Sequence, residues 1–283
     1  MFLLSIELPE AKILADQMNF ELKGKRIERF CLQNCQKLQK IGFIHSDNKP
    51  FDQLLNREIV SVASRGNTIL MKLDENLNLI LNPEYGGEIF YHSSEATVPE
   101  KFHVRIDFSD KTLLTVRFTS MGGIRALKDS ELANSYVYKR DFNQETPSPL
   151  DETFTFERFS ELLASHNCAL KSALVGKDAL LVGLSNSAFQ DIIYRAKLHP
   201  KRKASDLDSN EQRALWKSIN LVLNERLRLN GKNQFFDLYQ TPGRYVPAMG
   251  PNMRNKKCGI CDSLVQELSL GGGKVFVCPQ CQF

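Results

Sequence analysis

Four cysteines near the end of the sequence have the spacing of a metal site. They form two Cys-x-x-Cys pairs separated by the sixteen residues 262–277, and the four are Cys258, Cys261, Cys278 and Cys281. Each pair can place two thiolates at adjacent corners of a tetrahedron, which fits a structural zinc site with four protein ligands. A redox-active Cys-x-x-Cys is the alternative, but it needs only one pair beside a βαβ pattern. We therefore predict one structural Zn²⁺ ion bound by these four residues.

Basic residues gather in two places, although the formal net charge of the 283 residues is only +4. One group lies between residues 197 and 203, and the other lies between residues 254 and 257. Local clusters of this kind favour an anionic partner. Ordinary solvated surface charge explains them equally well, so charge alone leaves the partner open.

The composition predicts a soluble, cytoplasmic protein. Hydrophobic residues make up 42% of the chain and charged residues 25%, and no apolar run approaches the ~20 residues that a membrane span needs. The apolar patch at the start has no basic segment before it, and Glu7, Pro9 and Glu10 end it early. We therefore expect no signal peptide and no membrane partner.

The first half of the chain predicts one helix followed by strands. Residues 12–22 carry apolar side chains at near-helical spacing, so a helix should stop at Gly24. Short apolar runs separated by turn signals then extend from residue 26 to residue 125, which is typical of an antiparallel β-sandwich. The predicted strands lie within residues 59–62, 68–73, 77–81, 104–108 and 113–118.

Beyond a proline-containing linker at residues 144–151 the pattern becomes helical. Helices are predicted over residues 156–163, 168–174 and 187–198, and Asp208 with Glu211 forms a capping box that opens a longer helix reaching Gly231. Residues 264–268 and 274–277 predict a hairpin between the cysteine pairs. The fold class is therefore α+β, with a β-sandwich and leading helix at 1–145, a helical domain at 150–240 and a four-cysteine zinc finger at 245–283.

Three motifs occur in an order that resembles one enzyme family. Glu7-Leu8-Pro9-Glu10 lies near the start, residues 182–186 precede a helix ending in Leu198-His199-Pro200, and residues 278–282 read CPQCQ. With these motifs the chain resembles the formamidopyrimidine-DNA glycosylase and endonuclease VIII family over nearly its whole length. The resemblance implies a helix-two-turn-helix domain and a zinc finger that hold the phosphates of damaged duplex DNA. It also implies that the β-sandwich receives an extruded base.

The resemblance indicates DNA contacts in the second half of the chain. Asn186 matches the family's phosphate-binding asparagine, and Lys171 matches the lysine of its Lys-x-x-Leu segment. Gly273 stands where the family's finger has a phosphate-binding arginine, and Lys274 beside it carries a charge without the bidentate fork. A plain helix N-cap is the alternative interpretation of Asn186, and the two roles are compatible.

In the first half, the family's DNA-contacting segments are altered. Arg65-Gly66-Asn67 aligns with the family's Arg-Gly-Lys. The arginine remains, but the neutral Asn67 replaces the phosphate-binding lysine. Tyr85 stands where a methionine fills the gap left by the extruded base. Residues 120–125 align with a family loop that wedges into the base stack. The two arginines of that loop are not kept in this chain. Met121 and Ile124 are the apolar residues available there.

The main departure lies at the catalytic position. The family's nucleophile is the amine of an N-terminal proline, and the glutamate that follows manages protons at the sugar. Here the glutamate is present as Glu7, but Ile6 occupies the proline position and five residues precede it. A nitrogen inside a peptide bond is not a nucleophile, because its lone pair is delocalised. For Glu7 and Glu10, favourable charge ahead of a helix is the alternative to catalysis.

We therefore expect a monomeric, zinc-containing protein of the base-excision-repair type. It would bind duplex DNA, damaged or bent duplexes included, in the nucleoid and without the family's usual covalent intermediate. In one alternative, base excision is retained, either by Glu7- or Glu10-assisted hydrolysis or by an amine exposed through processing before Ile6. In another, an RNA-binding or scaffold protein reuses the fold.

Overall fold

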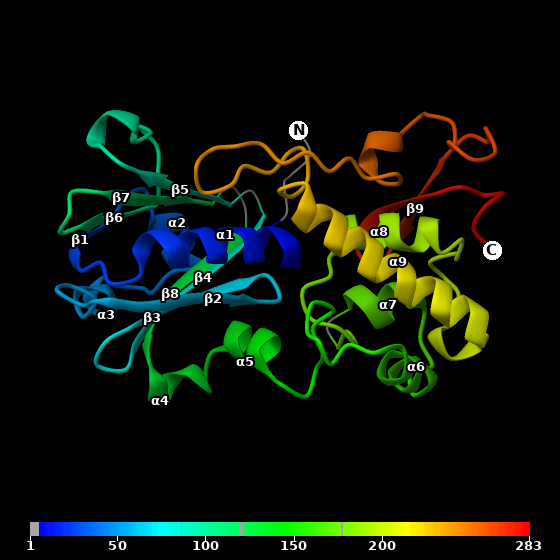
Figure 1. Ribbon diagram of the computed structural model, residues 1–283, viewed down its shortest axis with the longest axis horizontal. Helices are drawn as coiled ribbons and strands as arrows, with labels where there is room; N and C mark the ends of the chain where they lie inside the picture. The colour runs from blue at the N-terminus through cyan, green and yellow to red at the C-terminus, as the bar shows by residue number, and fades with distance from the viewer. Residues whose placement is uncertain (1–5, 86, 119–120, 177) are drawn as a thin grey trace. The chain divides into compact units, whose positions relative to one another are not determined.

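The computed structural model describes residues 6–85, 87–118, 121–176 and 178–283, with the backbone alone described at Glu84, Tyr85 and Met121. The described chain forms two compact units (Figure 1). The first, here called the sandwich unit, takes in the described residues up to Asn143 together with Leu229–Arg244. The second, the helical unit, comprises Gln144–Arg228 and Tyr245–Phe283. The finer three-domain division stays a prediction.

Helix α1 (Leu8–Leu22) begins four residues before the predicted start. A capping box explains this difference, because Glu7 is the N-cap and Glu10 reaches back to the backbone N–H of Glu7 at 3.2 Å. The helix ends before Gly24, whose φ of +82° suits glycine, as predicted. Its buried side chains at helical spacing enter the core of the sandwich unit.

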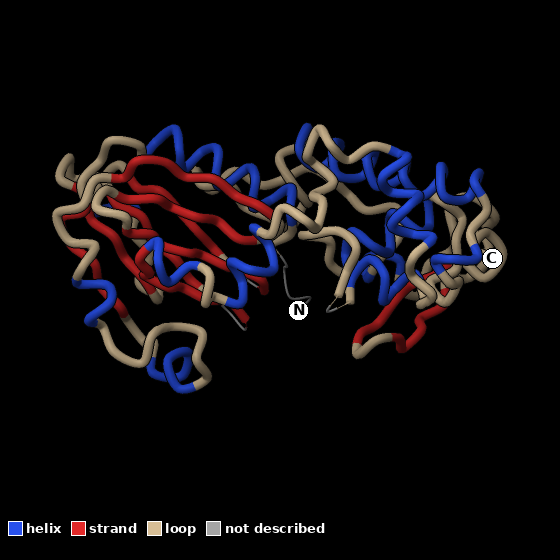
Figure 2. The backbone as a smooth tube through the Cα atoms, turned by 90° about the horizontal axis from the view of Figure 1, so that it is seen from below, coloured by secondary structure: helices blue, strands red, loops and turns tan. Residues whose placement is uncertain are grey.

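Two four-stranded antiparallel sheets confirm the predicted β-sandwich (Figure 2). The first sheet has the order β2 (Ile59–Arg65), β3 (Thr68–Leu73), β4 (Leu77–Tyr85) and β8 (Met121–Lys128). The second has the order β1 (Ile27–Leu32), β6 (Val104–Phe108), β7 (Leu113–Arg117) and β5 (Glu88–His92). Alternating buried residues of both sheets form one hydrophobic core, which includes Ile69, Met71, Leu79, Ile106 and Val116.

Strands β1, β5 and β8 were not predicted, and β8 corrects the expected wedge loop. Residues 122–125 belong to a strand that pairs with β4, and Ile124 is fully buried in the core, so its side chain does not protrude toward DNA. Gly122 is required there, because a Cβ would lie 2.5 Å from the Phe118 ring. Ser120 lies outside the described residues, and the side chain of Met121 does too.

Short helices surround the sandwich. They are α2 (Gln36–Lys40), α3 (Lys49–Asp52), a 3₁₀ turn (Glu95–Thr97), α4 (Asp129–Leu132) and α5 (Tyr136–Phe142). Helices α4 and α5 contact the face of the first sheet that points away from the main core. There Leu70, Ile80 and Leu132 form a second, smaller apolar cluster.

The helical unit contains the four predicted helices. They are α6 (Phe156–Ala164), α7 (Leu170–Val175), α8 (Asn186–Arg195) and α9 (Ser209–Arg228), with 3₁₀ turns at Ala204–Asp206 and Pro251–Met253. The capping box of α9 is confirmed, because Glu211 accepts from the Asp208 N–H at 3.0 Å and Asp208 accepts from the Glu211 N–H at 2.9 Å. Strands β9 (Gln266–Leu270) and β10 (Gly273–Val277) form the predicted hairpin. Of the helices in the described ranges, none is long and apolar enough to cross a membrane.

Candidate functional site

The residues at the catalytic position are deeply buried. Ile6 is 1% exposed and belongs to the core of the sandwich unit. The side chains of Glu7 and Glu10 have no exposed surface, and both take part in the capping box of α1. Both carboxylates therefore fulfil the alternative role predicted for them, which is to place negative charge at the start of a helix.

A lysine that the sequence did not indicate lies against both carboxylates. The Nζ atom of Lys232 is 3.5 Å from Glu7 Oε2, and its backbone N–H donates to Glu10 Oε1 at 3.1 Å. Lys232 is 5% exposed. Its one local signal is its place after Gly231, which ends the predicted long helix. No pattern connects it with residues more than 220 positions earlier.

The fold holds Lys232 there through Leu229–Arg244, which we call the return segment. Phe235 and Leu238 of this segment enter the sandwich core, and the Leu238 N–H donates to Gln17 Oε1 at 3.0 Å. Gly231 has a φ of +85°. Gly243 passes so close that a Cβ would lie 2.2 Å from the carbonyl oxygen of Lys232. Both glycines are therefore needed for the path of the backbone at this point.

Three of the predicted DNA-contacting residues meet in the helical unit. Lys171 Nζ donates to Asn186 Oδ1, and Asn186 Nδ2 donates to the carbonyl oxygen of Lys274 at 2.8 Å. Asn186 is the first residue of α8, and Ser185 occupies the N-cap position, so the N-cap interpretation of Asn186 is wrong. The Lys274 ammonium pairs with Glu267 of β9. We call Lys171, Asn186 and Lys274 the lysine–asparagine cluster.

The cluster lies at a backbone geometry that attracts anions. Asn186 lies at the N-terminus of the ten-residue helix α8, and this end of the helix carries partial positive charge. The turn of the β9–β10 hairpin passes beside it, and a Cβ at Gly271 would lie 3.6 Å from the Lys171 side chain. Gly271 and Gly272 both have positive φ. The arrangement is suited to a phosphate group.

Arg65 and its neighbours form a separate buried network in the sandwich unit. Arg65 Nη1 donates to the carbonyl oxygens of Asp141 at 2.5 Å and Asn143 at 2.7 Å. Asp141 is 1% exposed, accepts from the Thr68 hydroxyl at 2.5 Å and pairs with Arg140 at 2.6 Å. These bonds attach the β2–β3 turn to α5. The proposed contact of Arg65 with DNA stays a prediction, and the side chain of Tyr85 is outside the described part.

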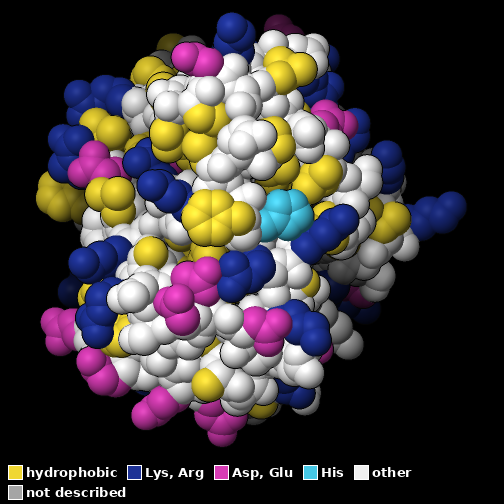
Figure 3. All heavy atoms as spheres, turned by 90° about the vertical axis from the view of Figure 1, so that its right-hand side faces the viewer, with side chains coloured by type: hydrophobic (Ala, Val, Ile, Leu, Met, Phe, Trp, Pro, Cys, Tyr) yellow, Lys and Arg dark blue, Asp and Glu magenta, His cyan; other side chains and the backbone are white. Residues whose placement is uncertain are grey.

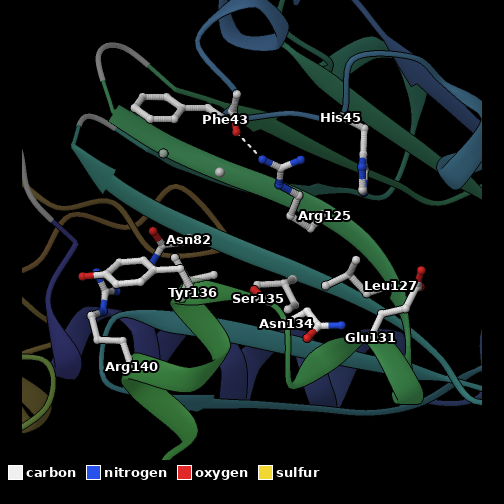
Figure 4. Close-up of a pocket in the computed structure, with 15 residues that line it drawn as sticks. Phe43, His45, Asn82, Arg125, Leu127, Glu131, Asn134, Ser135, Tyr136 and Arg140 are labelled. Atoms are coloured by element: carbon white, nitrogen blue, oxygen red, sulfur yellow. Dashed lines mark hydrogen bonds between the residues drawn. The ribbon is translucent and has the colours of Figure 1, made fainter.

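A pocket of about 710 Å³ opens between β8 and α4–α5 (Figure 4). Arg125 and His45 lie along its β8 side, opposite Tyr136 and Arg140 of α5. Arg125 donates to the carbonyl oxygen of Gly42, and Arg140 pairs with Asp141. Arg125 therefore links β8 to the segment that contains Gly42, whereas the Arg140–Asp141 pair lies within α5.

The four predicted ligand cysteines converge. Their Sγ atoms all lie within 4.8 Å of one another. The Tyr194 hydroxyl is 3.2 Å from Cys258 Sγ, and the N–H of Ile260 donates to the same sulfur at 3.4 Å. Burial raises the pKa of the Cys258 thiol, but these bonds prevail and bring that pKa down to about 6. A set of four thiolates fits a tetrahedral metal ion with no open position.

Helix α8 connects the cysteine cluster with the lysine–asparagine cluster. Tyr194 lies near its end, Asn186 lies at its start, and Gln190 between them accepts from the Phe276 N–H of β10 at 2.8 Å. Gln282 donates to the carbonyl oxygen of Leu198 at 2.9 Å and accepts from the Cys278 N–H at 2.9 Å. The finger thus contacts α8 at Asn186, Gln190 and Tyr194, and it bonds to Leu198 just beyond the end of the helix.

The basic groups noted in the sequence are partly neutralised. Arg202 forms two bonds of 2.9 Å with the Glu211 carboxylate, and Arg254 pairs with Glu267 at 2.7 Å. On the face shown in Figure 3, Lys and Arg side chains are interspersed with Asp and Glu side chains. The described residues on that face therefore present no broad basic surface to which an anionic partner could bind. The lysine–asparagine cluster is the better candidate.

Comparison with known proteins agrees with the geometry. Residues 6–121 match the sequence model of the formamidopyrimidine-DNA glycosylase N-terminal domain, and residues 146–236 match that of its H2TH domain. The formamidopyrimidine-DNA glycosylases of Heliobacterium modesticaldum and Streptococcus pneumoniae are 28% and 24% identical to this chain. Each alignment covers 98% of this chain, and 99% and 98% of the respective relatives.

Solved structures share the fold over the same extent. A complex of Lactococcus lactis Fpg with DNA that contains an abasic site has a TM-score of 0.83 at 20% identity, covering 98% of this chain and 99% of that one. The MutM (Fpg) protein of Thermus thermophilus has a TM-score of 0.81 at 20% identity, covering 98% of each chain. The two domain matches, the full-length relatives and the shared fold show that this chain belongs to the formamidopyrimidine-DNA glycosylase and endonuclease VIII family.

Proposed function

We propose that this chain binds duplex DNA as a monomer through the lysine–asparagine cluster and a finger built on one Zn²⁺ ion, and that the nitrogen of residue 6 is not its nucleophile. The observation that carries the second part is the burial of Ile6 in the sandwich core, with five residues before it in the sequence. A peptide nitrogen has no available lone pair. The family's usual terminal-amine route is therefore closed in the full chain.

The lysine–asparagine cluster supports the first part of the proposal. An ammonium group, an amide and a helix N-terminus lie together in it, and each favours a phosphate oxygen. One of the solved structures named above, that of Lactococcus lactis Fpg, is a complex with DNA. Binding of this kind should weaken steeply with salt because counterions are released from the duplex, whereas an RNA-binding scaffold would show no preference for duplex DNA.

We expect Asn186→Ala to weaken duplex binding by about tenfold, in line with the loss of hydrogen bonds to a charged group. The melting temperature should change little, because Asn186 does not occupy the N-cap position of the helix. Fluorescence anisotropy with a labelled duplex at two salt concentrations measures the first effect, and thermal unfolding measures the second.

Asn224→Ala is the matched control, since Asn224 is an exposed asparagine on α9 of the same unit. It should leave the affinity unchanged within about twofold. A large fall in melting temperature for Asn186→Ala would show that Asn186 serves the fold. Equal affinities for both variants would show that the cluster does not contact DNA.

One observation favours the alternative that base excision is retained. Glu7 keeps the position of the family's glutamate, and its Oε2 atom lies 3.5 Å from the Nζ atom of Lys232. Intact mass of the purified chain reports whether residues 1–5 are removed. Free base released from a duplex with an oxidised purine, without a covalent species, would indicate hydrolysis assisted by Glu7 or Glu10.

A further inference from the structure

Lys232 is an unusual lysine in this chain. Of the lysines that the structure describes, two are buried, Lys171 and Lys232. Lys171 donates to the neutral amide of Asn186. Lys232 instead faces the Glu7 carboxylate in the sandwich unit, and both side chains are nearly sealed from water, at 6% and 0% exposure.

A buried ion pair of this kind costs desolvation energy and is weak evidence for stability alone. Buried titratable pairs are, by contrast, common where chemistry occurs. A lysine amine is the side chain that forms Schiff bases with carbonyl compounds. The attack requires that the ammonium proton leaves first, and the Glu7 carboxylate at 3.5 Å is placed to receive it.

The position matters as much as the chemistry. Glu7 directly follows Ile6, the residue at the catalytic position, so Lys232 Nζ contacts the residue next to the place where a terminal amine would be. Glu10 fixes the backbone N–H of Lys232 at 3.1 Å, and Gly231 and Gly243 shape the segment that carries it. The structure thus supplies an amine where the sequence has lost one.

We propose that the Lys232 amine attacks the aldehyde of an abasic deoxyribose in duplex DNA, with Glu7 as the acceptor of its proton. The proposal rests on the DNA binding proposed above. The nitrogen lone pair forms a bond to C1′, and the carbonyl oxygen gains a proton to give a carbinolamine. Loss of water then gives the imine. Removal of a C2′ proton from this imine breaks the C3′–O bond and releases the 3′ phosphate, so no oxidant or reductant is consumed.

Lys232→Arg tests this step because arginine keeps the positive charge next to Glu7 but does not form an imine. Each variant is incubated with a labelled duplex that contains an abasic site, and sodium borohydride reduces the imine to a stable amine. We expect Lys232→Arg to lower the yield of trapped complex at least about a hundredfold, as expected when a covalent nucleophile is removed. Peptide mass mapping of the wild-type adduct should place the sugar remnant on Lys232.

Lys25→Arg is the matched control, since Lys25 is a half-buried lysine of the same unit that pairs with Asp110 at 2.6 Å. It should leave the yield unchanged within about twofold.

Anisotropy with the same duplex separates the two proposals. Tight binding without an adduct, or an adduct mapped to Ile6 or another lysine, overturns the role of Lys232, whereas absence of binding overturns the proposed function itself. Equal melting temperatures of wild type and Lys232→Arg show that the fold is kept, and if that variant does not fold, the adduct map of the wild type alone decides.

Discussion

Cys278→Ala is expected to remove the metal from the finger and weaken duplex binding by about tenfold to a hundredfold. Metal ligation and folding are coupled in a small tetrathiolate module, so three remaining thiolates will not hold the β9–β10 hairpin in place. The hairpin supplies Lys274 and packs beside Lys171. The loss of one or two bonds to a charged phosphate accounts for the size of the effect. Metal analysis of the purified protein and anisotropy with a labelled duplex measure the two results.

Cys168→Ala is the control, because Cys168 lies in the helical unit outside the cluster of four. It should keep one Zn²⁺ ion per chain and the wild-type affinity. Removal of the metal from the wild type by a strong chelator should reproduce the effect of Cys278→Ala. Unchanged affinity in a metal-free protein would show that the finger takes no part in binding, and a metal other than zinc would correct the proposed ion.

Asp141→Ala is expected to destabilise the sandwich unit by about 1–3 kcal/mol, the range for leaving a buried hydrogen-bonding group without its partner. The Asp141 carboxylate accepts from Thr68 and Arg140 and lies against Gly66 at the β2–β3 turn. Without it, the buried Thr68 hydroxyl and the Arg140 guanidinium, which is 29% exposed, each lose a partner. Urea unfolding followed by circular dichroism measures the change in the free energy of unfolding.

Asp16→Ala gives the comparison, since Asp16 forms an exposed ion pair with Lys12 on α1, where its side chain is 63% exposed. Exposed pairs contribute little, so this variant should lie within about 0.5 kcal/mol of wild type. If Asp141→Ala is as stable as Asp16→Ala, the bonds of the Asp141 carboxylate to Thr68 and Arg140 do not stabilise the sandwich unit.

The parts of the fold with strong local periodicity could be predicted. The capping box at Asp208 and Glu211, the short apolar runs of β3 and β7, and the glycine turn of the finger each act over a few residues. Strand β8 could not, because Gly122 and Gly123 lower the apparent strand propensity. Glycine is needed at residue 122 by a contact with Phe118, which no local pattern shows.

The candidate site shows the same division. The cysteine ligands follow a fixed spacing, so the sequence contains the whole signal. Lys232 meets Glu7 only because the return segment enters the core of the sandwich unit through Phe235 and Leu238. Such a contact joins residues 225 positions apart and depends on tertiary packing rather than on any nearby pattern. Asn186 was recognised through its motif, but its bond to the Lys274 backbone required the structure.

The position of helix α8 predicts that metal binding and DNA binding are coupled. Helix α8 contacts the four-cysteine cluster through Tyr194 and contributes Asn186 to the lysine–asparagine cluster. The proposed binding of metal and of DNA would therefore share one helix. Reciprocity then requires that whatever factor the ion adds to the affinity for nucleic acid, a bound duplex adds to the affinity for the ion. Zinc should therefore bind more tightly in the presence of DNA, as equilibrium competition with a colorimetric chelator would record. Equal zinc affinities with and without DNA would show that the two ends of the helix act independently.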